Sequence, residues 1–123
     1  MTNQHEKINY LEFPVTDMQG SKDFFSSAFG WKFTDYGPEY ASFSKEVGID
    51  GGFYYGDKKA TTESGSVLVV LYSRDLESTL SNVIEAGGTV VKPVFDFPGG
   101  RRFHFTDPSG NEFAVWSDRG ISE

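Results

Sequence analysis

EFPVTDMQGSKDFFSSAFG (12–30) and VLYSRDLESTLSNVIEAGG (70–88) share one pattern, in which a β-like run ends at an aspartate and an amphipathic segment closed by glycine follows. The two aspartates, Asp17 and Asp75, lie 58 residues apart, and the same spacing superimposes alanines and glycines further along the chain. A repeat of this kind indicates a structural unit that is present twice. The sequence therefore predicts an α+β fold of two paired βαβββ modules, whose half-sheets form a curved trough.

Each of the two aspartates is a good candidate for the N-cap of a helix. The first helix is predicted over residues 18–29. Gly20 and several polar residues would make this helix unstable in isolation, so we expect packing on a sheet to stabilise it. The second helix follows Asp75. Its apolar residues recur at helical spacing and form a predicted core stripe of Leu76, Leu80, Val83 and Ile84.

Eight short β-rich runs flank these helices and are bounded by Gly, Pro and Asp. They are residues 8–15, 31–36, 40–46 and 51–55, then 67–72, 89–95, 101–106 and 111–117. The run at 67–72 (VLVVLY) is continuously apolar, as expected for a strand that is buried on both faces. The polar stretch 56–66 is predicted to link module one (8–55) to module two (67–117) within a single domain that covers residues 1–123.

The amino-acid composition narrows the classes of function that this protein can have. The net charge of −7 disfavours nucleic acid and anionic membranes as partners. The sequence has neither a run of eighteen apolar residues nor the apolar core of a signal peptide, so we expect a soluble, cytoplasmic protein. The lack of cysteine excludes disulfides and thiolate chemistry. The chain has 12 Phe, 6 Tyr and 2 Trp, enough to fill a core or to line a pocket.

Four segments, EFPVTD, FFSSAFGW, RDLESTLSNVIEAGGTVV and above all GRRFHFTDPSGNEFAVW, resemble the vicinal oxygen chelate superfamily of glyoxalases, bleomycin-resistance proteins and extradiol dioxygenases. The resemblance covers nearly the whole chain. It implies that the paired modules form an eight-stranded, U-shaped mixed sheet around a cavity, often in a homodimer. Because one fold hosts many functions, the fold alone does not assign an activity.

Enzymes of this superfamily hold a divalent metal with His, Glu or Gln from both modules. Carried onto this sequence, the family's ligand positions fall on Tyr10, Leu68 and Ala114, with the fourth near Tyr54 or Gly56. Leu and Ala have no lone pair to donate to a metal. The resemblance therefore implies a member without the usual metal site, and we expect no metal and no other cofactor.

A displaced metal site is the alternative. Alternation along the strands places Glu12 and Glu112 toward the trough, and His104 and Arg102 inward as well, with Phe103 and Phe105 toward the helices. A trio of Glu12, His104 and Glu112 matches a facial ligand set in composition only.

The same side chains have structural interpretations. His104 is the one histidine placed for proton transfer, but it fits a cavity wall equally well. Glu12 either pairs with Arg101 or Arg102 as a structural contact, or stands unpaired as a base or an acceptor for a ligand amine. The run PGGRR (98–102) is interpreted as a hairpin turn with solvated arginines, because a strand and not a helix follows it.

Aromatic side chains complete the predicted trough. Phe43 is assigned to the core, and Tyr10 and Trp116 to the cavity. The full set of predicted ligand-binding residues is Tyr10, Glu12, Tyr54, Arg102, His104, Glu112 and Trp116. No residue is assigned a catalytic role, since one usable histidine and no cysteine do not build a nucleophilic triad.

Three functions follow from these observations. The first is a metal-independent, small-molecule-binding protein, similar to bleomycin-resistance proteins, that binds or sequesters an amphipathic or aromatic ligand. The alternative is a metal-dependent lyase (lactoylglutathione lyase-like), isomerase or dioxygenase that uses the displaced site. The third is an interaction domain, such as a homodimer that pairs through exposed edges or an aromatic surface.

Overall fold

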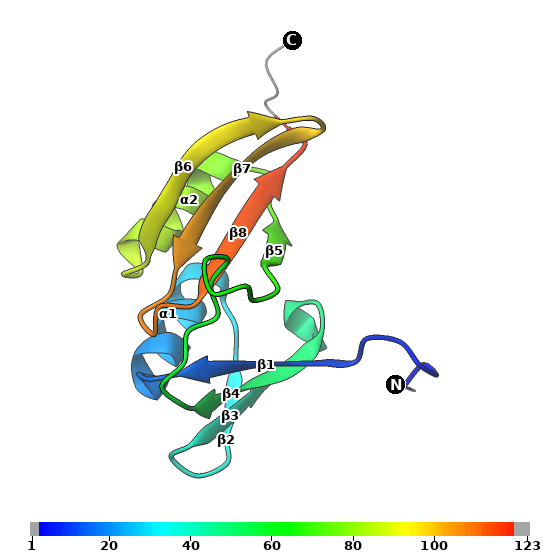
Figure 1. The fold of residues 1–123 in the computed structure, drawn as a ribbon, viewed down its shortest axis with the longest axis vertical. Coiled ribbons are helices and arrows are strands. Elements are labelled where there is room, and N and C mark those ends of the chain that lie inside the picture. The colour runs from blue at the N-terminus through cyan, green and yellow to red at the C-terminus, as the bar shows by residue number, and fades with distance from the viewer. Residues whose placement is uncertain (1–2, 120–123) are drawn as a thin grey trace.

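The structure is a computed structural model and describes residues 3–119. Module one contains β1 (Tyr10–Val15), α1 (Met18–Phe29), β2 (Phe33–Asp35), β3 (Tyr40–Phe43), a 3-10 turn η1 (Lys45–Val47) and β4 (Asp50–Tyr55). Module two contains β5 (Val69–Tyr72), α2 (Leu76–Glu85), β6 (Thr89–Phe97), β7 (Gly100–Thr106) and β8 (Glu112–Ser117). The predicted α+β fold of two βαβββ modules is confirmed (Figure 1).

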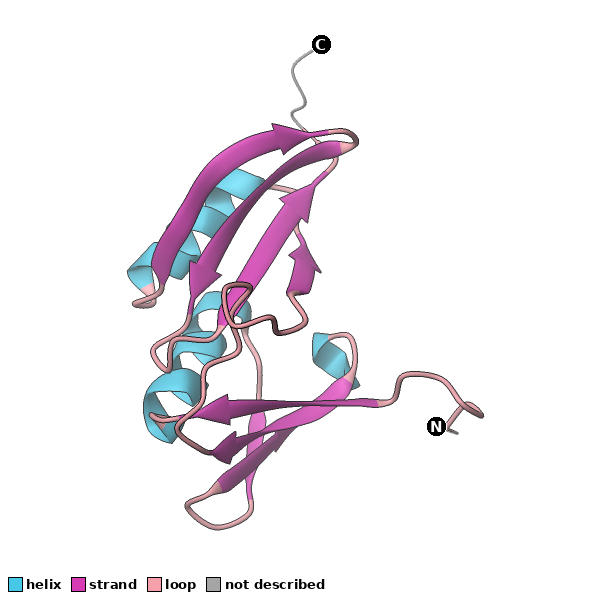
Figure 2. Ribbon diagram, viewed as in Figure 1, coloured by secondary structure: helices cyan, strands magenta, loops and turns pink. Residues whose placement is uncertain are grey.

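The eight strands pair as two mixed four-stranded sheets, in the orders β1-β4-β3-β2 and β5-β8-β7-β6. In each sheet the first strand of the module runs parallel to the last one, and the other pairs are antiparallel. The strands of the two sheets run in different directions (Figure 2). The two sheets are not hydrogen-bonded to each other. An apolar opening of about 330 Å³ lies between their edge strands β1 and β5 and is lined by residues such as Leu11 and Leu71.

Both helices begin at the predicted aspartates. The Asp17 carboxylate accepts a hydrogen bond of 2.9 Å from the amide of Gly20, and that of Asp75 accepts one of 3.2 Å from the amide of Ser78. Helix α1 ends at Gly30, whose φ of 75° lies in the left-handed region that glycine favours. The two capping aspartates therefore set the register of the repeat.

The core is shared by the two modules, because α1 packs against both sheets. The Phe25 ring centroid lies 5.7 Å from that of Phe53 in the first sheet and 5.1 Å from that of Phe113 in the second. Phe24 of the same helix contacts Phe105 at 5.7 Å. Figure 1 shows α1 at the junction of the two sheets, next to α2. Neither sheet buries its apolar face without residues from the other module.

Phe43 is buried in this core, as predicted, and so are Phe103 and Phe105. Two predictions of burial were wrong. Ile84, assigned to the core stripe of α2, is 54% exposed, because α2 contacts the sheet through Leu76 and Val83. The run 67–72 is not buried on both faces: β5 is an edge strand that pairs only with β8, and Val67 is 82% exposed.

A helix must be long and apolar to span a membrane. No helix within residues 3–119 is long and apolar enough to cross a membrane.

Candidate functional site

The seven predicted ligand-binding residues lie on the faces of the sheets that point away from the shared core, and they fall into two groups. Tyr10, Glu12 and Tyr54 belong to the first sheet, where the register pairs Glu12 with Gly52 and Pro14 with Tyr54. The second group lies on the second sheet and consists of Arg102, His104, Glu112 and Trp116. One chain therefore presents two separate polar surfaces.

Tyr10 and Glu12 are joined by a residue that the sequence analysis missed, Tyr40 of β3. The Tyr40 hydroxyl lies 2.6 Å from the Tyr10 hydroxyl and donates a hydrogen bond of 2.9 Å to Oε2 of Glu12. Burial and the hydrogen bonds with Tyr10 and Glu12 raise the pKa of Tyr40, so its hydroxyl stays protonated. We call Tyr10, Glu12 and Tyr40 the tyrosine cluster. The sequence could have pointed to Tyr40 as a site residue only if the register that pairs it with Tyr54 of β4 had been known.

The tyrosine cluster depends on a glycine. A Cβ atom at Gly52 would lie 2.2 Å from the Tyr40 hydroxyl oxygen and 2.9 Å from the carbonyl oxygen of Ala41. Both distances are shorter than atoms tolerate, so Tyr40 can lie across the sheet only because β4 has no side chain at this position.

We expect Gly52→Ala to displace Tyr40 and to break its bond to Glu12. The loss of stability should be about 1–3 kcal/mol, the range for overpacking, measured by urea unfolding. Gly56→Ala is the control, since its nearest contact would be an ordinary 3.4 Å to the ring of Tyr54. The two-dimensional NMR signals of the Tyr40 ring should shift in the first variant and not in the second. Unshifted Tyr40 signals in Gly52→Ala would contradict this account.

A groove of about 520 Å³ lies beside the tyrosine cluster. Residues of four strand regions line it, among them Tyr10, Thr34, Tyr36, Tyr40, Ser42 and Asp50. Tyr10 is 44% exposed and Tyr36 is 65% exposed; Tyr54, at 41%, lies on β4 opposite Tyr40 of β3 and outside the groove lining. Exposed aromatic rings around a carboxylate are typical of a surface that contacts other molecules.

The second group is built around a hydrogen-bonded pair of His104 and Glu112. Nδ1 of His104 lies 2.8 Å from Oε2 of Glu112, and both side chains are buried. The other carboxylate oxygen accepts hydrogen bonds of 2.8 Å from the amide and the hydroxyl of Thr62. The amide of Glu112 donates to the carbonyl oxygen of Ala60. The linker is thus tied to the face of the second sheet.

These contacts set the protonation of the pair. Burial alone would raise the pKa of Glu112, but the hydrogen bonds from His104 and Thr62 bring it below its usual value. Since a carboxylate only accepts hydrogen bonds, we assign the hydrogen to Nδ1 of His104. Nε2 of His104 is buried and has no hydrogen-bond partner within the described residues.

The sequence analysis predicted solvated arginines in the β6–β7 hairpin, and this was wrong, because both are partly buried against other side chains. Arg101 forms an ion pair with Glu77 of α2. The Arg102 guanidinium lies 5.5 Å from the ring centroid of Phe95 and 5.8 Å from that of Phe97, and its Nε is buried. The predicted pairing of Glu12 with either arginine was also wrong: Glu12 bonds to Tyr40 in the other sheet.

The turn Asp107–Asn111 holds the modules together. The buried Asp107 accepts a hydrogen bond of 3.0 Å from the hydroxyl of Ser21 on α1, and Asn111 donates one of 2.6 Å to the carbonyl oxygen of Pro14 on β1. Burial raises the pKa of Asp107 despite its hydrogen bonds. This turn fixes the position of β8, and so of Glu112, relative to module one.

The residues do not fit a metal site of the kind that the alternative hypothesis requires. Within residues 3–119 no three or more of the His, Asp and Glu side chains gather closely enough to hold a metal ion. In the predicted trio, Glu12 belongs to the first sheet, whereas His104 and Glu112 belong to the second and bond to each other. The trio is therefore not assembled within one chain.

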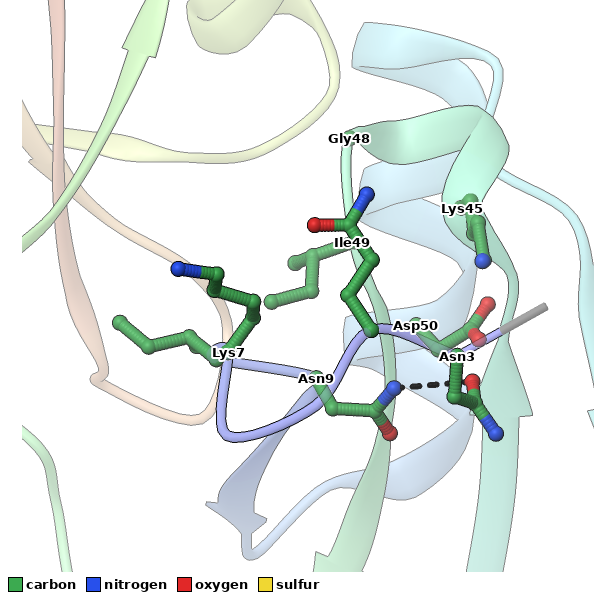
Figure 3. Close-up of a pocket in the computed structure, with 9 residues that line it drawn as sticks. Asn3, Lys7, Asn9, Lys45, Gly48, Ile49 and Asp50 are labelled. Atoms are coloured by element: carbon green, nitrogen blue, oxygen red, sulfur yellow. Dashed lines mark hydrogen bonds between the residues drawn. The ribbon is translucent and has the colours of Figure 1, made fainter.

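Another hollow, of about 600 Å³, lies where the segment before β1 crosses the start of β4 (Figure 3). Its lining is largely polar, and Asn9 donates a hydrogen bond of 3.0 Å to Asn3. None of the predicted site residues lines it. Asp50 lines both this hollow and the groove beside the tyrosine cluster.

Comparison with known proteins identifies a family. The sequence model of the Glyoxalase/Bleomycin resistance protein/Dioxygenase superfamily matches residues 7–115. The chain is 32% identical to the anthracycline biosynthesis protein DnrV of Streptomyces peucetius over 131 residues, which cover 93% of this chain and 47% of DnrV. It spans about half the length of the curated relatives it matches.

Solved structures share the fold. A glyoxalase-related enzyme from Fulvimarina pelagi superimposes with a TM-score of 0.76 at 17% identity, covering 91% of this chain and 88% of that one. The antibiotic-binding protein TnmS3 from Streptomyces sp. CB03234 superimposes with a TM-score of 0.66 at 24% identity, covering 95% of this chain and 98% of that one.

Proposed function

Because the chain belongs to the glyoxalase/bleomycin resistance protein/dioxygenase superfamily, we propose that it is a single glyoxalase-like domain that binds a small, flat or amphipathic organic molecule without a metal ion. The observation that carries the proposal is the groove beside the tyrosine cluster, whose lining includes the exposed rings of Tyr10 and Tyr36 and the carboxylate of Asp50. Apolar walls with a few polar anchors are the usual form of a small-molecule site. The antibiotic-binding protein TnmS3 and DnrV, a protein of anthracycline biosynthesis, make such a ligand reasonable.

The residues divide between two roles in this proposal. Tyr10, Glu12 and Tyr54 would contact the ligand directly, with Tyr40 as a fourth contact. The second group, Arg102, His104, Glu112 and Trp116, would form a further ligand-facing surface, in which Trp116 lies opposite Arg102 across β7 and β8.

We further propose that the protein acts as a homodimer in the cytoplasm. Relatives about twice as long have room for four modules in one chain, and two copies of this chain would supply the same number. The apolar opening between β1 and β5 is a surface that a second copy would protect from water.

Binding can be tested with a panel of planar and amphipathic molecules in the presence of a metal chelator. A true ligand at a hundredfold excess over its Kd should add about 2.7 kcal/mol to the free energy of unfolding, and so raise the melting temperature. Tyr54→Ala should weaken binding at least about tenfold, as loss of an aromatic contact at a hot spot does. Tyr55→Ala is the matched control, since Tyr55 is the next residue and its side chain alternates away from the cluster. Unchanged melting temperatures across the whole panel would refute the proposal.

A metal-dependent enzyme is a second candidate function, although residues 3–119 of one chain assemble no metal site. The observation in its favour is Nε2 of His104, which has no hydrogen-bond partner within those residues and belongs to a ring that Glu112 orients. Elemental analysis distinguishes the two functions. A stoichiometric divalent metal that survives purification, together with a metal-induced rise in melting temperature, would favour the enzyme, because metal that binds only the folded state stabilises it.

A further inference from the structure

We propose that the tyrosine cluster recognises a protonated amine, so that the ligand of this face is an aromatic or planar organic cation. The inference rests on the proposed small-molecule function and specifies the chemical class of its ligand. It follows from the direction of the hydrogen bonds, from the uncompensated charge of Glu12 and from the rings that surround it.

The hydrogen bonds of the cluster have one consistent direction. Glu12 only accepts when ionised, so Tyr40 must donate its single hydroxyl hydrogen to it across 2.9 Å. The 2.6 Å contact between the two hydroxyls then requires Tyr10 to donate to Tyr40. Both hydroxyl hydrogens are used. The cluster is left with lone pairs on Tyr10 and Glu12 and nothing to donate, which suits a ligand N–H and not a ligand oxyanion.

The negative charge of Glu12 is not neutralised by the protein. Among the described residues no Lys, Arg or His nitrogen lies within 4.0 Å of its carboxylate. Asp50, which pairs with Tyr10 in the sheet register, places a carboxylate in the adjacent groove, whose lining includes Tyr10 and Tyr40 but not Glu12. The basic residue in the lining, Lys32, precedes β2 at the opposite edge of the sheet from β1. The β1 side of the groove therefore favours a cation.

Aromatic rings frame this carboxylate. Tyr10 flanks Glu12 on β1, and Tyr54 lies two register pairs further along, on β4 opposite Pro14. Both residues are partly exposed, so a ligand can reach them. An ammonium within about 6 Å of such a ring is attracted by its quadrupole, and a flat ligand body can stack on it. The carboxylate matches the charge of a protonated amine, and the rings match the flat body of an aromatic ligand.

The test compares two probes that share the naphthyl ring but carry an ammonium or a neutral hydroxyl group, 2-naphthylmethylamine and 2-naphthalenemethanol, by calorimetric titration of the 123-residue protein at pH 7 and physiological salt. We expect the amine to bind at least about tenfold more tightly, as a charge-assisted hydrogen bond predicts. In Glu12→Gln this preference should fall to about twofold or less, because the carboxylate is gone while the rings remain. Glu85→Gln, an exposed carboxylate on α2 with the same change in net charge, should keep the full preference.

Each other outcome is informative. Equal binding of both probes to the unchanged protein would overturn the amine inference and leave the proposed function intact. A preference that survives Glu12→Gln, or disappears in Glu85→Gln, would overturn the assignment to Glu12 and point to general charge attraction. If neither probe binds, the inference fails; the proposed function fails with it only if the uncharged panel also leaves the melting temperature unchanged.

Discussion

Phe113→Ala should remove about 3–5 kcal/mol of unfolding free energy, the cost of truncating a buried aromatic side chain. Phe113 is fully buried on β8, and its ring centroid lies 5.2 Å from Phe13 of β1, 5.1 Å from Phe25 of α1 and 5.5 Å from Phe105 of β7. It is the side chain at which both sheets and α1 meet. A cavity at this position would weaken the packing of both modules at once.

Urea unfolding measures this loss. A domain of this size has a total stability of about 5–15 kcal/mol, so the alanine variant could be too unstable to purify folded. Phe113→Leu therefore serves as the milder second variant and should lose about 1–2 kcal/mol. Tyr36→Ala, which truncates an exposed aromatic residue, should change stability by less than about 0.5 kcal/mol. A Phe113 series no more destabilising than Tyr36→Ala would contradict the shared core.

Glu112→Ala should cost about 2–6 kcal/mol, because it leaves at least two buried hydrogen-bond donors without an acceptor, at about 1–3 kcal/mol each. His104 would lose the partner of Nδ1, and the amide of Thr62 would lose its acceptor. Glu63→Ala is the control, since Glu63 is the exposed carboxylate next to Thr62 on the linker. Amide hydrogen exchange at Thr62 should accelerate strongly in Glu112→Ala and remain unchanged in the control. Slow exchange in both variants would show that the linker is held by other contacts.

The same pair predicts a pH dependence. The pKa of Glu112 is lowered in the folded protein, so ionised Glu112 stabilises the fold above its usual pKa of about 4.3, and this stabilisation is lost as the pH falls through the lowered value. Glu112→Gln lacks this titration. The stability difference between the unchanged protein and Glu112→Gln should therefore shrink as the pH is lowered from about 6 to 3. A difference that grows over this range would contradict the assigned protonation.

The sequence predicted the architecture well where local chemistry and global packing agree. Helix α1 was predicted over the residues that form it, because Asp17 and Gly30 mark its two ends with capping chemistry. The spacing of 58 residues then placed the second helix correctly. The prediction that residues 67–72 are buried on both faces was wrong, because a continuous apolar run indicates burial but does not show whether the strand lies at a sheet edge.

The sequence analysis named the candidate residues but not their grouping, and their role in ligand binding stays a prediction. Strand alternation placed Tyr10 and Glu12 on one face, yet it does not show which residues of distant strands lie opposite them. Tyr40 was missed for this reason: its contact with Glu12 crosses β4 at Gly52, and only the observed register brings the two together. The pairing of Glu112 with His104 likewise follows from β7 lying beside β8.

The position of α1 between the two sheets has a consequence for synthesis of the chain. Phe24 and Phe25 of module one pack against Phe105 and Phe113 of module two, which are synthesised much later. The first module emerges from the ribosome with its helix exposed on one side, and a newly made chain must wait for β8 before that surface is covered. Module one therefore cannot complete its apolar core before module two has been synthesised, although the repeat gives each half a full set of secondary-structure elements.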